Sequence, residues 1–147
     1  MTNEPEFGWF DYTSSPPKYV MVSGAEADRI RASLAQAVGL QSGATGVQVV
    51  DAMFETAATL VAYDFEPEGV DLRSLLDKAS VPEPREIYLV SDPLSTLFRL
   101  STSDIGRDLS NVFQLGGVDV MILDPDLGWA LFLMHYGVVC FKRLSDR

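Results

Sequence analysis

The chain is short of the residue types on which many functions depend. Its 147 residues include one cysteine and one histidine, too few for an internal disulfide or for the three protein ligands of a zinc site. No apolar run reaches the ~20 residues that cross a bilayer. The acidic start, MTNEPEFGWFDY, lacks the basic and apolar segments of a signal peptide. We therefore expect a cytoplasmic protein that needs no metal and no cofactor.

Basic residues are scarce as well. Eleven lysines and arginines stand against 21 aspartates and glutamates, which gives a net charge of −10, and no basic patch is visible. Because this sign repels phosphate backbones and anionic lipids, we expect neither nucleic acid nor a membrane as a partner. An acidic surface favours basic partners and speeds the encounter with them, although acidity also serves solubility alone.

The sequence signatures of common enzymes are absent. The chain holds no G-x-G-x-x-G, no Walker A motif, no G-x-S-x-G and no H-E-x-x-H. The segment DPDLG begins like the calcium-binding loop of an EF-hand. However, Trp129 and His135 stand where that loop needs a glycine and a bidentate glutamate. The signal for catalysis is therefore weak.

Residues 1–19 are expected to form an extended aromatic N-terminal arm, because Pro16 and Pro17 prevent a continuous helix. One short strand is expected around residues 18–22. Trp9 is one of four aromatic residues that lie close together in this arm. These rings either fold back onto the rest of the chain or form an exposed patch for a partner.

The rest of the first half is patterned for helices. Ser23 with Glu26, and Thr45 with Gln48, form two capping boxes that each begin a helix. A short third helix is expected over about residues 71–79. Apolar spacing selects the residues that face the core. They are Ile30, Leu34, Ala37 and Val38 in the first helix, Val47, Val50, Phe54, Ala57 and Val61 in the second, and Leu72, Leu75 and Leu76 in the third.

The second half is patterned for strands. Ser103 is placed to cap one further helix that reaches Phe113. The expected strands are 86–91, 95–101, 118–123, 129–135 and 138–143. This order predicts an α+β fold, in which N-terminal helices are followed by an antiparallel β-meander with one inserted helix. We expect a single α+β domain over residues 1–147.

The last two expected strands hold the only histidine and the only cysteine. A two-residue turn at Tyr136 and Gly137 would place His135, Cys140 and Trp129 on one face of the sheet. The apolar neighbours of Cys140 indicate a buried thiol rather than a nucleophile. Apolar residues alternate onto both faces of these strands, which is typical of a central strand covered on two sides.

The turn and hairpin in this region also carry a resemblance. Asp124, Asp126, Leu127, Trp129 and His135 match the strand–turn–strand pattern of an uncharacterised family of small bacterial α+β proteins. Many members of that family are encoded beside polymorphic toxins and are regarded as immunity proteins. The resemblance covers about residues 70 to 143, and it implies a protein that binds and neutralises a cognate toxin.

These observations give the expected function. We expect a non-enzymatic immunity protein, a monomer or weak homodimer, that occludes a cognate toxin with a basic surface. A house-keeping adaptor or assembly subunit, and a small enzyme that uses His135, remain alternatives. The candidate partner-binding residues are Asp64, Glu66, Glu68, Asp71, Asp124, Asp126, Trp9 and His135.

Overall fold

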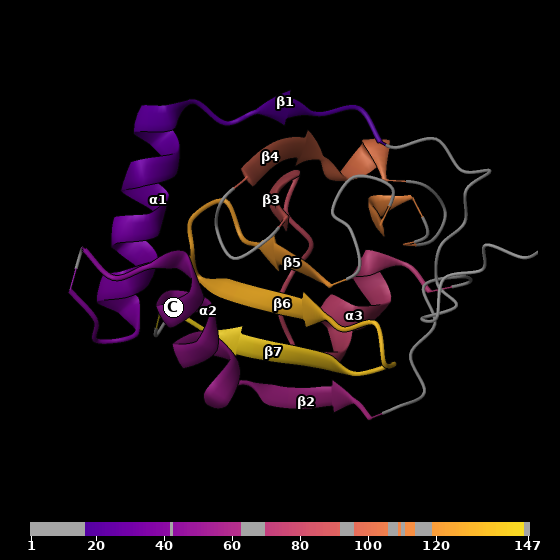
Figure 1. Ribbon diagram of the computed structural model, residues 1–147. Coiled ribbons are helices and arrows are strands. Elements are labelled where there is room, and N and C mark those ends of the chain that lie inside the picture. The colour runs from indigo at the N-terminus through magenta and orange to yellow at the C-terminus, as the bar shows by residue number, and fades with distance from the viewer. Residues whose placement is uncertain are drawn as a thin grey trace, which may run out of the picture.

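A seven-stranded antiparallel sheet with helices on both of its faces forms the centre of the molecule (Figure 1). The computed structural model describes residues 17–41, 43–62, 70–91, 96–105, 109, 111–113 and 119–145. The described part contains three α-helices, so the expected α+β class is confirmed. Within it, no helix combines the length and the apolar character that crossing a membrane requires.

The order of the strands across the sheet is β1-β4-β3-β5-β6-β7-β2. Their bounds are β1 Val20–Met21, β2 Ala58–Val61, β3 Glu86–Ser91, β4 Thr96–Ser101, β5 Val120–Leu123, β6 Trp129–Leu133 and β7 Val139–Arg143. The five strands expected in the second half, and the short strand near residue 20, are therefore confirmed. The strand β2 was not expected. Both edges of the sheet thus come from the first half of the chain.

The helices begin at side chains that satisfy their first backbone N–H groups. The helix α1 (Gly24–Ala37) starts after Ser23, whose hydroxyl accepts from the N–H of Glu26. The helix α2 (Gly46–Glu55) has a complete capping box between Thr45 and Gln48. The helix α3 (Leu72–Lys78) follows Asp71. All three starts agree with the sequence pattern.

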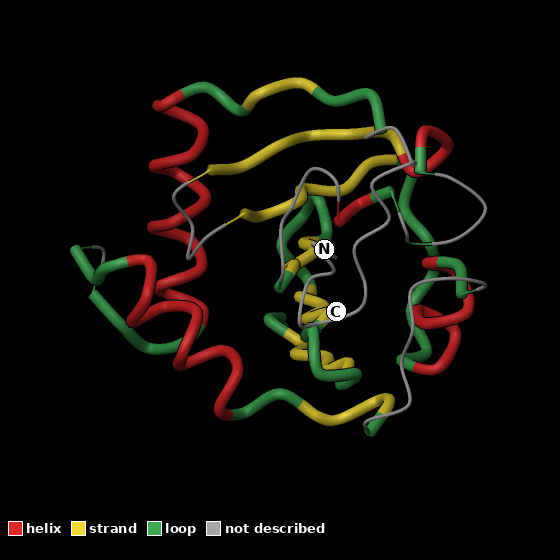
Figure 2. Tube along the Cα trace, turned by 45° about the vertical axis from the view of Figure 1, so that its right-hand side comes forward, coloured by secondary structure: helices red, strands yellow, loops and turns green. Residues whose placement is uncertain are grey.

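The sheet separates two apolar cores. Figure 2, in a view turned from that of Figure 1, shows helices on both sides of the strands. The helices α1 and α2 cover one face, and α3 covers the other together with Leu109, Val112 and Phe113. Residues alternate between the cores along each central strand. In β6, for example, Trp129, Leu131 and Leu133 join the α3 side, whereas Ala130 and Phe132 join the α1 side. The expectation of a strand covered on two sides is confirmed.

The buried face of α2 agrees only in part with the one expected from apolar spacing. Val50, Phe54 and Ala57 pack against the core on the α1 side, as expected. Val49 and Met53 are fully buried, whereas Val47 is 54% exposed. The helix also ends at Glu55, and the chain continues into β2, where Ala58 pairs with Phe141 of β7. The expected stripe therefore covers one side of the true buried face, because the sheet lies nearest to Val49 and Met53.

The helix expected to begin at Ser103 does not begin there. Residues Thr102–Asp104 form a single 3₁₀ turn, capped by the hydroxyl of Ser101, and Ile105 after it is extended. Leu109, Val112 and Phe113 are nevertheless buried on the α3 side, as their apolar spacing indicated. Ser101 and Thr102 also bond with the carbonyl of Arg85 at the start of β3, which holds this turn against the sheet.

Candidate functional site

The tip of the hairpin between β6 and β7 is built differently from the expected two-residue turn. Leu133 pairs with Val139, and the N–H of Met134 donates to the carbonyl of Val138. The loop therefore contains three residues and ends at Gly137, whose φ of 90° favours glycine. The extra residue shifts the register of β7 by one position.

This shift separates the histidine from the cysteine. Because one step of register turns every side chain to the other face, Cys140 lies on the α1 side, opposite Trp129. The expectation that His135 and Cys140 share a face with Trp129 is therefore wrong. Cys140 is only 5% exposed, and burial raises the pKa of its thiol. A buried, protonated thiol is a poor nucleophile.

His135 instead pairs with a residue that the sequence reading missed. Its backbone N–H donates to Oδ1 of Asp119 at 2.8 Å, and its ring Nδ1 lies 2.8 Å from the same oxygen. A carboxylate only accepts hydrogen bonds, so Asp119 keeps the proton of the neutral imidazole on Nδ1 and fixes the ring. The pairing of β5 with β6 brings these two residues together, and the signal for it was the aspartate immediately before Val120.

Tyr136 stands beside this pair at the tip of the hairpin. Its ring meets the ring of His135 edge to face, with 5.2 Å between the centroids. Tyr136 is 45% exposed, while the side chain of His135 is 29% exposed. Asp119, His135 and Tyr136 thus form one partly exposed cluster, called the hairpin-tip cluster below. The carboxylate of Asp119 and the edge-to-face contact orient its two rings.

The second acidic candidate is the turn between β5 and β6. The N–H of Leu127 donates to the carbonyl of Asp124, which closes the expected turn. The Oδ2 atom of Asp124 accepts from the N–H of Gly128 at 2.9 Å. A Cβ at Gly128 would lie 2.8 Å from that oxygen, so only glycine allows the approach. Burial, and to a lesser extent the charge of Asp126, raises the pKa of Asp124.

The raised pKa leads to a prediction about Asp124→Asn. The folded state holds the proton of Asp124 more tightly than the unfolded state, so its contribution to stability is full below pH 3.8 and is lost as the pH rises through the folded-state pKa. Asparagine keeps an acceptor for Gly128 without the charge. We expect this variant to be more stable than the wild type at pH 7, with the difference shrinking towards pH 3. Urea denaturation between pH 3 and 7 measures it.

The matched control for this prediction is Asp126→Asn. Asp126 is exposed, so the control should change the free energy of unfolding by no more than about 0.5 kcal/mol at pH 7. A lower stability of Asp124→Asn at pH 7 would show that the carboxylate is a better partner for Gly128 than its burial suggests.

Of the other acidic candidates, only Asp71 lies among the described residues. Asp71 caps α3, where it accepts from both the hydroxyl and the backbone N–H of Ser74, and these bonds lower its pKa. This exposed carboxylate therefore has a local structural role. Trp9, Asp64, Glu66 and Glu68 lie outside the described residues, so their predicted role in binding stays a prediction.

The hairpin-tip cluster and the turn of Asp124 lie at opposite ends of β5 and β6. β5 and β6 are antiparallel, with Val120 opposite Leu133 and Leu123 opposite Ala130. The hairpin-tip cluster therefore lies at one end of these strands and the turn of Asp124 at the other. Val61 of β2 pairs with Val139, so β2 ends at the end of the sheet that carries the hairpin tip.

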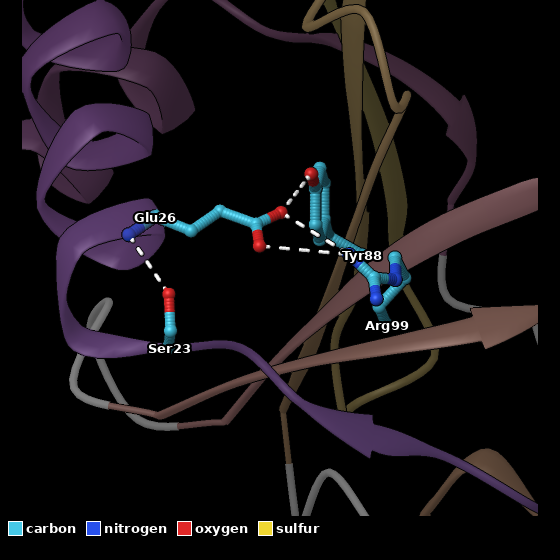
Figure 3. A network of polar contacts seen from close by, with 4 residues as sticks. All are labelled: Ser23, Glu26, Tyr88 and Arg99. Atoms are coloured by element: carbon cyan, nitrogen blue, oxygen red, sulfur yellow. Dashed lines mark hydrogen bonds and ion pairs between the residues drawn. The ribbon is translucent and has the colours of Figure 1, made fainter.

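A further polar network joins α1 to the sheet (Figure 3). The hydroxyl of Tyr88 donates to Oε2 of Glu26 at 2.7 Å, and the guanidinium of Arg99 lies 3.5 Å from both carboxylate oxygens. The side chain of Glu26 therefore points to β3 and β4 and away from Ser23, the residue with which the sequence paired it. Burial, followed by Glu26, raises the pKa of Tyr88. We interpret this network as a structural link between helix and sheet.

The candidate site contains no recognisable metal centre. Among the described residues, no three His, Cys, Asp or Glu side chains come together closely enough to hold an ion. Comparison with known proteins adds no family, because no protein family, curated protein or solved structure matches the chain.

Proposed function

We propose that the chain is a non-enzymatic binding protein, and specifically an immunity protein that neutralises a cognate toxin by stoichiometric binding and occlusion. The observation that carries the proposal is the hairpin-tip cluster. An exposed tyrosine on a tight hairpin, held by an adjacent histidine that is itself clamped by a carboxylate, loses little conformational entropy on binding. Tyrosine is also among the residues that contribute most to protein interfaces.

Two further observations support a partner with a basic surface. The net charge of −10 attracts such a partner at long range. Asp119 adds a carboxylate with a 43% exposed side chain beside Tyr136. The resemblance of residues 70–143 to the immunity-protein family points to the same class of partner. A protein that neutralises a toxin by occlusion covers the active surface of the toxin and needs no catalytic residues of its own.

The experiment is a capture assay with the product of the neighbouring gene, followed by rescue of its toxicity. We expect the wild type to bind this product and to restore growth. Tyr136→Ala should weaken binding at least tenfold, because removal of a central aromatic anchor costs about 2 kcal/mol or more. The control is Tyr19→Ala, a tyrosine of similar exposure next to β1. Equal binding by both variants would remove the hairpin tip from the interface.

The pair of Asp119 and His135 favours a second candidate, a small hydrolytic enzyme. A carboxylate that holds the Nδ1 proton orients Nε2 as a base, as in known histidine–carboxylate pairs. A turnover screen with ester and phosphoester substrates tests this candidate. Activity that is lost in His135→Ala and retained in Cys140→Ala would favour the enzyme over the binding protein.

A further inference from the structure

Three adjacent apolar residues are exposed at β1, one of the two edge strands of the sheet. Tyr19, Val20 and Met21 are 46%, 55% and 56% exposed, and they are three of the five large apolar residues that are exposed in the described part of the chain. In both views β1 lies at the top rim of the molecule, beyond β4 (Figures 1 and 2). Single exposed apolar residues are ordinary, whereas a contiguous group at a sheet edge marks a surface for another strand.

The backbone of this edge directs hydrogen-bonding groups outward. The N–H of Val22 donates to the carbonyl of Leu97 beside it in β4, at 3.1 Å. Alternate residues of a strand direct their N–H and C=O groups to opposite sides. Val20 therefore faces β4 in the same way as Val22, whereas the N–H and C=O groups of Tyr19 and Met21 face away from the sheet.

The side chains at β1 divide between the two faces of the sheet. Met21 is paired with Phe98, and the ring of Tyr19 meets the ring of Phe98 edge to face, with 5.1 Å between the centroids. Phe98 belongs to the core on the α3 side, so Tyr19 and Met21 lie on that face and Val20 lies on the other. Tyr19 and Met21 thus continue the α3-side core to the edge of the sheet, where they stay exposed.

The charges at this edge differ from those of the chain as a whole. Residues 17–25 and the strand β4 contain Lys18 and Arg99 but no aspartate or glutamate, although the net charge of the chain is −10. The carboxylate of Glu26, which follows, already lies beside Arg99. Two copies of an acidic chain repel each other, so they approach most easily at an edge without free carboxylates. The other edge strand, β2, is interrupted by a bulge, which disturbs the pairing of a further strand.

We propose that β1 pairs with β1 of a second copy of this chain, in an antiparallel arrangement with the two-fold axis at Val20. Tyr19 then lies opposite Met21 of the other copy, and each of these two pairs exchanges two hydrogen bonds through the outward-facing groups. An axis one residue earlier would place Pro17, which has no N–H, opposite Met21. An axis one residue later would place Ser23 opposite Tyr19, and the carbonyl of Ser23 already accepts from the first turn of α1.

Such a dimer joins the two sheets into one and keeps their faces aligned. On the α3 side, the thioether of Met21 meets the ring of Tyr19 of the other copy, and contacts between sulfur and an aromatic ring are favourable. The hairpin tip lies between β6 and β7, towards the other edge of the sheet, so both tips stay open. The dimer is therefore independent of the proposed binding function. Its interface is short, which is typical of a weak dimer that forms at high concentration.

The test is sedimentation velocity of the full chain, up to millimolar concentration. We expect the wild type to shift from monomer to dimer, and a wild type that stays monomeric throughout would overturn the proposal. Val20→Lys places two lysines together at the axis, so it should weaken self-association at least tenfold. The matched control is Val47→Lys, which makes the same change in charge at a valine of 54% exposure on α2 and should change self-association less than twofold. Equal effects of the two variants would contradict pairing through β1.

A second variant covers the case in which a lysine beside Arg99 loosens β1 itself. Met21→Pro removes an N–H that faces away from the sheet, so the bonds between β1 and β4 remain while the dimer loses its own. We expect at least tenfold weaker self-association with little change in melting temperature. Undiminished self-association of Met21→Pro would exclude the proposed hydrogen bonds and overturn the pairing.

Disulfide formation tests the position of the axis. The two copies of Val20 form a non-hydrogen-bonded pair with Cα atoms about 4.5 Å apart, within the range that a disulfide spans. Mild oxidation should therefore link Val20→Cys into a covalent dimer and leave Val47→Cys monomeric, since the native Cys140 is buried. Equal linkage of both variants would overturn the proposed axis. Self-association that appears only after deletion of residues 1–16 would assign the edge to the chain's own N-terminal segment and would overturn the choice of a second copy.

Discussion

Replacing Trp129 by alanine is expected to lower the free energy of unfolding by about 3–5 kcal/mol. Trp129 begins β6 and is only 4% exposed. Its ring lies 6.1 Å from that of Phe141 on the neighbouring strand, within the core on the α3 side. Removal of the indole leaves a cavity that the surrounding strands cannot close without breaking their pairing. Urea or guanidinium denaturation measures the loss as a shift of the midpoint.

The control for this prediction is Tyr136→Ala on the hairpin that follows the same strand. Tyr136 is exposed, so its removal should change the free energy of unfolding by about 0.5 kcal/mol or less. A small effect of Trp129→Ala would mean that the indole is accessible, and Trp129 would then become a candidate for the interface.

Met53→Ala is expected to cost about 2–5 kcal/mol, because Met53 is fully buried between α2 and the sheet. The matched variant is Val47→Ala on the same helix. Val47 is largely exposed, and alanine has the higher helix propensity, so this change should be neutral or slightly stabilising. Thermal unfolding of the two variants side by side tests which face of α2 meets the core. The opposite order of effects would restore the stripe predicted from the sequence.

Signals that act over a few residues predicted most of the fold. The hydroxyls of Ser23 and Thr45 begin helices because the groups that they bond lie within one turn. The apolar residues on both faces of residues 129–135 predicted a central strand, which the structure shows as β6. The edge strand β2 was missed. Its four residues become a strand only because β7, much later in the chain, presents an open edge to Ala58.

The candidate site was predicted only in part, for the same reason. His135 could be selected because it is the only histidine, but its partner Asp119 depends on the pairing of β5 with β6. The register of β7 depended on one residue of loop length. Glycine at the end of a three-residue loop was the available signal for it, and this signal competes with a two-residue turn that also contains Gly137.

The placement of β1 and β2 at the two edges sets an order of events during synthesis on the ribosome. Val20 pairs with Arg99, and Ala58 pairs with Phe141, so neither edge strand has its partner when it first emerges. The α1–α2 segment must wait beside an unfinished sheet with Leu34 and Met53 uncovered. A nascent chain of this design closes its core only after β4 and β7 have emerged, and a pause in synthesis before that point would hold it in a form that invites aggregation.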